Sequence, residues 1–210
     1  MKKLFTLITA MAMTMAINAQ VITFGDVAVP NADLPEAWTA GDVKLVLTND
    51  GKPTIDLSKA KFGTVDENTQ FVSRLKSGGK SSGKRFLTLT VPSKGTVKIA
   101  ARTGKGTDNT RTIVLTQNDK ELVNKVLDEA EAVKKVHPYV TASVEAGDIV
   151  ITFPNGSINF YAVEFIAEST GIHQLDAKSA NNDTYNPAGQ RVGKNYKGVV
   201  IANGKKYVQK

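Results

Sequence analysis

The sequence predicts a mostly β protein whose body is an antiparallel β-sandwich followed by a short C-terminal β-hairpin segment. Apolar and polar residues alternate along several short segments, and this period of two places one face of each segment on a core. Gly, Asn, Asp, Pro and Ser fill the gaps between the segments. Many short strands joined by such turns are typical of antiparallel sandwiches.

The alternation is clearest at Val43–Thr48, Leu87–Val91 and Thr112–Thr116. In each of these segments one face is apolar and the other is rich in polar residues, so we expect the second face to be wetter. Further strands are expected at Val21–Phe24, Phe71–Leu75, Thr96–Arg102, Tyr139–Val144, Asp148–Phe153 and Ile158–Ile166.

The strand expected at Ile158–Ile166 contains two adjacent aromatic residues. Neighbouring residues of a strand point to opposite faces, so only one of the two rings can face the same core. Tyr161 alternates with Val163 and Phe165, which favours a buried Tyr161. Phe160 would then face outward. The pattern leaves open which of the two rings lies in the core.

One stretch, Glu121–Lys135, does not follow the period of two. Its apolar residues recur at helical spacing among good helix formers, and periodicity alone predicts a helix there. The resemblance described below implies a strand and a loop instead. Both alternatives stay open.

The N-terminus has the pattern of a secretory signal peptide. Lys2 and Lys3 precede an uncharged stretch, Leu4–Ile17, and Ala19 is a small residue suited to cleavage. The stretch is about fourteen residues long, whereas a membrane-spanning helix needs about twenty. We therefore predict a signal peptide at residues 1–19 and no transmembrane segment after its removal. The absence of cysteine excludes disulfides and thiol chemistry.

The net charge of +7 is concentrated at the end of the chain. Thr184–Lys210 contains six basic and no acidic residues, while Val21–Asp183 contains 19 basic and 20 acidic ones. Nucleic-acid binding requires a basic stripe on the folded body. The near-neutral body therefore predicts no nucleic-acid partner.

Catalytic and metal-binding patterns are scarce. His137 and His173 are the only histidines and neither has the spacing of a metal ligand. The chain lacks a nucleophile elbow and a phosphate-binding glycine loop. The pairs Asp66–Glu67 and Asp128–Glu129 are adjacent in sequence, which says nothing of the separation that glycoside hydrolysis requires. We predict no metal, no cofactor and no enzymatic activity.

The region Phe86–Ile166 resembles small β-sandwich domains of secreted Bacteroidetes proteins that are appended to pectate-lyase-like and other polysaccharide-degrading enzymes. The resemblance lies in the segments Leu87–Pro92, Gly95–Arg102, Thr110–Leu115, Asp148–Ile151 and Asn159–Phe165. With the weaker region Lys44–Leu75 it covers about two thirds of the chain. The resemblance implies a jelly-roll sandwich related to galactose-binding and carbohydrate-binding modules.

The C-terminal segment, residues 185–210, is similar to the short ends of secreted Prevotella-type and Bacteroides-type proteins and of type IX secretion sorting domains. The similarity is carried by Gly189, Gln190, Arg191, Val192, Gly198, Asn203 and Gly204. Pro187 departs from this pattern, because a hydrophobic residue usually follows the Asn there. Asn203-Gly204 is also a strong tight-turn signal, and an accessory basic hairpin is the alternative. Residues 20–168 would then be the sandwich and 169–184 a polar linker.

Candidate binding residues combine aromatic rings with planar hydrogen-bonding groups, because sugars offer both C–H faces and hydroxyls. Trp38, Tyr139 and Tyr161 are candidate platforms, although core packing is an alternative role for Trp38 and Tyr161. Arg102 and Arg111 flank a glycine-rich loop, where they could bind a ligand or hold the hairpin in register.

These observations predict a secreted or surface-displayed, non-catalytic carbohydrate-binding-like module. Its expected partners are a polysaccharide and, through the tail, the export machinery. A periplasmic location follows if the tail is not a sorting signal. A structural or adhesive protein that binds another protein is the alternative, and a polysaccharide lyase or glycoside hydrolase is least favoured.

Overall fold

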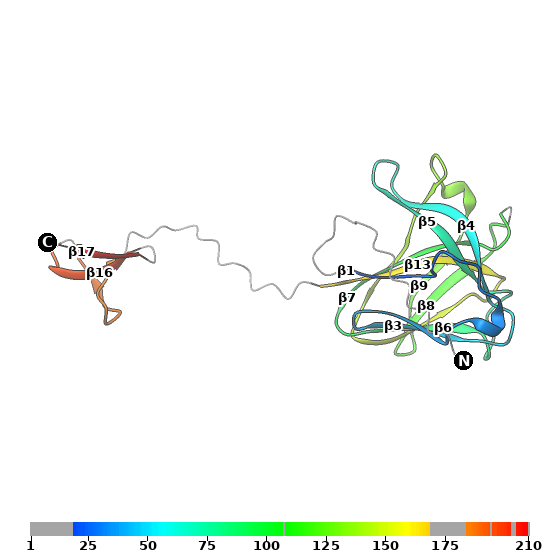
Figure 1. Cartoon of the computed structure of the whole chain (residues 1–210), viewed down its shortest axis with the longest axis horizontal. Coiled ribbons are helices and arrows are strands. Elements are labelled where there is room, and N and C mark those ends of the chain that lie inside the picture. The colour runs from blue at the N-terminus through cyan, green and yellow to red at the C-terminus, as the bar shows by residue number, and fades with distance from the viewer. Residues whose placement is uncertain (1–18, 107, 169–183, 194, 203–204, 210) are drawn as a thin grey trace. The chain divides into compact units, whose positions relative to one another are not determined.

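The computed structural model describes residues 19–106, 108–168, 184–193, 195–202 and 205–209. They form two compact units, one ending at Glu168 and one containing the strands from Thr184 onward (Figure 1). The described chain contains β-strands and two short 3₁₀ turns, and no α-helix. The predicted mostly β sandwich with a C-terminal hairpin is thereby confirmed. The predicted signal peptide, apart from Ala19, and residues 169–183 of the predicted linker lie outside the described residues.

One sheet of the sandwich, here called sheet A, has seven strands. Their order is β10-β4-β5-β13-β7-β11, and β1 also pairs with β13. All pairs are antiparallel except β10 with β4. The strands are β1 (Ala19–Thr23), β4 (Thr54–Gly63), β5 (Asn68–Lys76), β7 (Gly95–Thr103), β10 (Val136–His137), β11 (Val140–Val144) and β13 (Ile158–Ala167).

The opposing sheet, here called sheet B, has six antiparallel strands in the order β2-β3-β6-β12-β8-β9. They are β2 (Ala37–Ala40), β3 (Val43–Thr48), β6 (Phe86–Val91), β8 (Thr112–Gln117), β9 (Lys120–Val126) and β12 (Gly147–Thr152). The 3₁₀ turns η1 (Asn31–Asp33) and η2 (Glu129–Glu131) lie in the connections.

The main core lies between the two sheets and uses the apolar face of each alternating strand. Val43, Leu45 and Leu47 are buried in β3, as are Leu87, Leu89 and Val91 in β6. At one side the Gln117 side chain on β8 holds the turn between β11 and β12, because its Nε2 donates to the Glu145 carbonyl at 2.8 Å and its Oε1 accepts from the Glu145 N–H at 3.0 Å. Most of the apolar positions predicted from alternation belong to this main core.

A β-bulge in β13 explains the two adjacent aromatic residues. Phe160 pairs with Ala101 and Ala162 pairs with Ala100, so Tyr161 is an extra residue on its strand. Phe160 then faces the main core, and Tyr161 belongs to a second apolar cluster. Both rings are buried, which a strict period of two could not predict.

The second cluster lies against sheet A and is formed largely by the β4–β5 hairpin, drawn in cyan in Figure 1. Phe62 and Phe71 of this hairpin pack with Tyr161, and the rings of Phe62 and Tyr161 are 5.3 Å apart. Ala100 and Ala162 belong to the same cluster. Their small side chains leave room for the rings.

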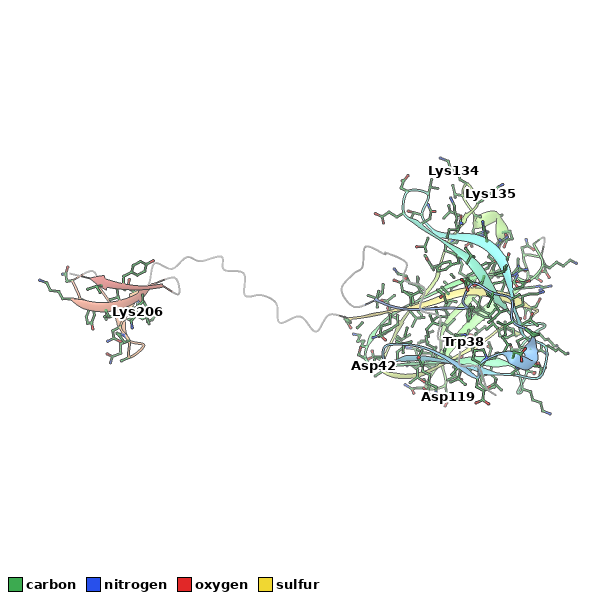
Figure 2. The ribbon with its side chains drawn as sticks, viewed as in Figure 1. Trp38, Asp42, Asp119, Lys134, Lys135 and Lys206 are labelled. Atoms are coloured by element: carbon green, nitrogen blue, oxygen red, sulfur yellow. The ribbon has the colours of Figure 1, made fainter. Side chains whose placement is uncertain are left out.

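The helix that periodicity predicted within Glu121–Lys135 is wrong. The region contains β9, which pairs with β8, and then η2. Asn118 and Asp119 join β8 to β9 with φ angles of 51° and 60°, and Figure 2 labels Asp119 at this turn. Two residues with positive φ form the hairpin turn that suits twisted strands, and cross-strand pairing here overrides helix propensity.

The second unit is a four-stranded antiparallel sheet in the order β15-β14-β16-β17, here called the tail sheet. Its strands are β14 (Thr184–Tyr185), β15 (Arg191–Val192), β16 (Gly198–Ala202) and β17 (Lys205–Gln209). Gly189 adopts a φ of 78° in the turn before β15, and Gly198 begins β16 with a φ of 143°. Asn203 and Gly204 lie outside the described residues.

Candidate ligand-binding surfaces

Arg102 on β7 forms a two-point ion pair with Glu129 of η2. Its Nε donates to Oε1 at 3.0 Å and its Nη2 donates to Oε2 at 2.5 Å. Hydrogen bonding to Glu129 raises the pKa of Arg102 above its ordinary value. The guanidinium edge that could bind a ligand is therefore occupied by a carboxylate of the same chain.

A small hollow lies beside this ion pair and includes His137. Its enclosed space is about 10 Å³, which is roughly the volume that admits one water molecule and is too small for a sugar ring. The lining residues are Ala101, Arg102, Lys125, Leu127, Asp128, Glu129, Glu131, His137 and Pro138.

His137 is buried between the ion pair and the second cluster. Its ring centre is 5.6 Å from that of Phe62, and its Nδ1 is 3.9 Å from Oε2 of Glu129. Burial and the positive charge of Arg102 lower the pKa of His137, while Glu129 acts in the opposite direction. The neutral imidazole is therefore the form that this environment favours.

Arg111 joins two loops at one end of the sandwich. Its Nε donates to Oδ2 of Asp108 at 2.8 Å, and its Nη1 donates to the carbonyl and the hydroxyl of Ser157 at 2.7 Å and 2.5 Å. A Cβ added at Gly156 would lie 2.9 Å from Arg111 Nε. Close packing and three hydrogen bonds thus hold this guanidinium in place.

Of the three candidate aromatic platforms, Tyr161 is buried in the second cluster, and the other two lie in different parts of the sandwich. Trp38 on β2, labelled in Figure 2, is half-buried at the edge of the main core. Its ring meets that of Phe24 edge-on at 5.3 Å. Tyr139 is half-buried in the second cluster, 5.7 Å from Phe62, and burial raises its pKa. Among the described contacts, none joins two of the four predicted residues Trp38, Arg102, Arg111 and Tyr139.

The outer face of sheet B presents an arrangement that the sequence analysis did not identify as a site. Across β3, β6, β12 and β8, Val46 pairs with Thr88, Thr88 with Val150, and Val150 with Thr116. Neighbouring strands are about 4.8 Å apart. Valine methyl groups and threonine side chains therefore alternate across four strands.

A second row continues this face two residues along each strand. Thr48 pairs with Phe86, and Thr152 pairs with Val114. We call the combined set the threonine–valine face: Val46, Thr48, Phe86, Thr88, Val114, Thr116, Val150 and Thr152. All eight are half-buried and none carries a charge.

The outer side of sheet A has a different chemistry. There Arg74 pairs with Asp56 at 2.7 Å, and Lys98 lies 3.7 Å from Glu164. The absence of charge is a property of these two rows, because the next row on the same face contains Lys44, Thr90 and Asp148. Alternating Thr and Val were visible in the sequence, but only the strand order shows that they share one continuous face.

Within the described ranges no group of His, Asp and Glu side chains has the arrangement of a metal site. The same part of the chain contains no helix with the length and hydropathy to span a membrane.

No protein-family model matches the sequence, and no curated protein matches it. Among solved structures, the chain is similar to one from Ruminococcus flavefaciens, described in work on the complexity of its cellulosome and an expansion in glycan recognition. That similarity has 13% identity and a TM-score of 0.38, and covers 71% of this chain and 93% of the other. A family two carbohydrate esterase from Cellvibrio japonicus matches with 11% identity and a TM-score of 0.28, over 60% of this chain and 34% of the esterase. Similarity at this level assigns neither ligand nor activity, so the function is argued from the chain's own residues.

Proposed function

We propose that the sandwich is a non-catalytic carbohydrate-binding module that holds an uncharged polysaccharide on its threonine–valine face. The observation that carries the proposal is the pair of uncharged rows, four strands wide, that forms the threonine–valine face between charged residues such as Lys44 and Asp148. A solvent-facing sheet ordinarily displays polar and charged side chains. An uncharged ligand suits a face without ionic groups.

The side chains of this face match the two surfaces of a sugar chain. A threonine offers a methyl group and a hydroxyl that both donates and accepts, while the valines and Phe86 offer apolar area. Pyranose rings likewise combine apolar C–H faces with hydroxyl edges. Many weak contacts spread over a preformed sheet would bind an extended chain with little loss of protein flexibility.

The carboxylates around the hollow support a non-catalytic role. Glu129 is held by Arg102, and Glu131 accepts two hydrogen bonds from Lys125. Asp128 accepts from the N–H of Ala130. General acid or base chemistry requires a carboxylate that reaches the substrate, and these three are engaged within the protein.

Binding to insoluble neutral polysaccharides, combined with a glycan array, tests the proposal. The double variant Thr88→Lys, Thr116→Lys should bind at least about tenfold more weakly, because two desolvated ammonium groups oppose an uncharged ligand. Thr141→Lys is the matched control, since Thr141 is an exposed residue on β11 of sheet A. It should bind like the native chain, and all three proteins should melt at similar temperatures.

Two outcomes would contradict this assignment. Binding that survives both lysines but disappears in Arg102→Ala would place the ligand at the hollow. A complete lack of glycan binding would favour the alternative that the face binds another protein.

We also propose that the tail directs the protein to the cell surface or the medium, with the sandwich as cargo. Support comes from residues 184–209, whose described strands form a sheet of their own. A sorting signal must remain accessible after its cargo has folded, and a separate unit suits that requirement.

A further inference from the structure

The tail sheet has a row of four side chains that crosses all of its strands. Arg191 pairs with Tyr185, Tyr185 pairs with Ile201, and Ile201 pairs with Lys206. Directly paired residues of an antiparallel sheet share one face. The row therefore has a cation at each end and an aromatic and an aliphatic side chain between them.

The same face continues along β16 and β17 through the pair Val199 and Val208. Tyr185 is 40% exposed, Ile201 37% and Val208 70%. On the opposite face Val200 is only 4% exposed, while Tyr207, with which it pairs, is 50% exposed. The tail face is defined here as Tyr185, Arg191, Val199, Ile201, Lys206 and Val208.

The size of the unit explains why this face is left open. A sheet of four short strands can bury few side chains, and Val200 is the buried apolar residue among those described in it. The tail face thus presents apolar area to solvent. Surfaces of this kind are commonly interaction sites.

Charge identifies the chemistry of the partner. Thr184–Lys210 contains six basic residues and no acidic one. No carboxylate side chain of the segment therefore opposes its attraction to a negatively charged surface. Aromatic and aliphatic groups flanked by cations are typical of segments that lie at a lipid–water interface. There the cations contact phosphates and the apolar groups enter the headgroup region.

We propose that the tail face docks on a membrane surface whose lipids carry anionic phosphate headgroups. Arg191 and Lys206 would contact phosphates on both sides of Tyr185 and Ile201, which would insert between headgroups. Each basic residue near an anionic surface contributes about 1 kcal/mol. The contact would hold the protein at a membrane without a spanning segment, and it is independent of glycan binding.

Flotation with lipid vesicles tests the proposal on the complete mature chain, residues 20–210. The chain should float with vesicles rich in phosphatidylglycerol and not with pure phosphatidylcholine vesicles. Binding should fall steeply in about 1 M salt, where the screening length is about 3 Å. Lys206→Glu should weaken binding by about tenfold or more, since it removes one attraction and adds one repulsion.

Further variants separate the tail face from other basic surfaces. Ile201→Ser should weaken binding without changing the charge, and Lys206→Gln should have an intermediate effect. Lys44→Glu is the matched control, because Lys44 is an exposed lysine on β3 of the sandwich, and it should bind like the native chain.

The proposal is overturned if the native chain fails to float with anionic vesicles. It is also overturned if the tail variants float as well as the native chain. Binding to soluble polyglutamate but not to vesicles would instead assign the face to an acidic protein. Glycan binding should be unchanged in every tail variant. A loss of vesicle binding can then be assigned to the tail and not to the function proposed for the sandwich.

Discussion

Arg85 and Asp50 form a two-point ion pair, in which Arg85 Nε donates to Asp50 Oδ1 at 2.8 Å and Nη2 donates to Oδ2. The side chain of Arg85 is only 6% exposed, and its Nη1 also donates to the carbonyl of Lys80 at 2.9 Å. A long loop before β6 is thereby tied to the turn after β3. Hydrogen bonding from Arg85 lowers the pKa of Asp50 to about 2.

Removal of the Asp50 carboxylate should destabilise the sandwich. We expect Asp50→Asn to lower the melting temperature by several degrees at pH 7, because a buried guanidinium would lose its counter-charge. In the native chain the ion pair stabilises the fold fully at pH values above the pKa of Asp50 in the unfolded chain, which is near 4. This stabilisation is lost as the pH falls through about 2, the pKa of Asp50 in the folded chain. The difference between the two proteins should therefore shrink in that interval. Asp66→Asn, at an exposed position, is the control, and an equal loss in that variant would contradict the prediction.

Arg111 should matter for stability and not for ligand binding. Arg111→Ala removes three hydrogen bonds and leaves the Ser157 carbonyl without this donor, so we expect a loss of about 1–3 kcal/mol in chemical denaturation. Arg111→Lys should lose less stability, since lysine keeps the positive charge but not the planar set of guanidinium donors. Glycan affinity should remain unchanged in both. A weaker affinity at unchanged stability would restore Arg111 as a binding residue.

Mild acid should weaken the sandwich through His137. Because its folded pKa lies below the unfolded value of 6.5, the unfolded chain binds the proton first, and stability falls as the pH drops below 6.5. Melting temperatures measured between pH 7 and 5.5 should decline in the native chain. The decline should be shallower in His137→Gln, and an identical slope in both proteins would exclude His137 as its origin.

The tail should be dispensable for folding but needed for localisation. Deletion of residues 185–210 should leave the melting transition of the sandwich nearly unchanged, because every residue of its two apolar clusters precedes position 169. In a host with type IX secretion, the folded product should then accumulate in the periplasm. Equal export of the truncated and complete proteins, measured by cell fractionation, would show that the tail is an accessory hairpin.

Strands with a strict period of two could be predicted from the sequence. The segment Val43–Thr48 coincides with β3, and Leu87–Val91 differs from β6 by one residue. The strands β2, β4 and β10 were missed. In β4 a register shift between Leu57 and Ala60 interrupts the alternation, so the pattern loses its period where the strand bends.

The candidate site was harder to predict than the fold. Arg102 and Arg111 were identified by their chemistry, but only folding brings Glu129 to Arg102 and Ser157 to Arg111. The threonine–valine face depends on the order β3-β6-β12-β8. This order places Val46 beside Thr88 and Val150 beside Thr116. The four residues are spread between positions 46 and 150, and no local pattern contains that information.

The place of β13 within sheet A has a consequence for how the protein forms. It is the last strand of the sandwich in the chain, yet it pairs with β1, the first strand, and with β5 and β7. Until residues 158–167 arrive, β5 and β7 each have one unpaired edge and β1 has no partner strand. A chain that emerges N-terminus first therefore completes sheet A only when its last strand appears. Until then the earlier strands of that sheet lack part of their hydrogen-bond partners. Holdase chaperones that protect unpaired edges should accordingly matter most in the interval just before β13 emerges.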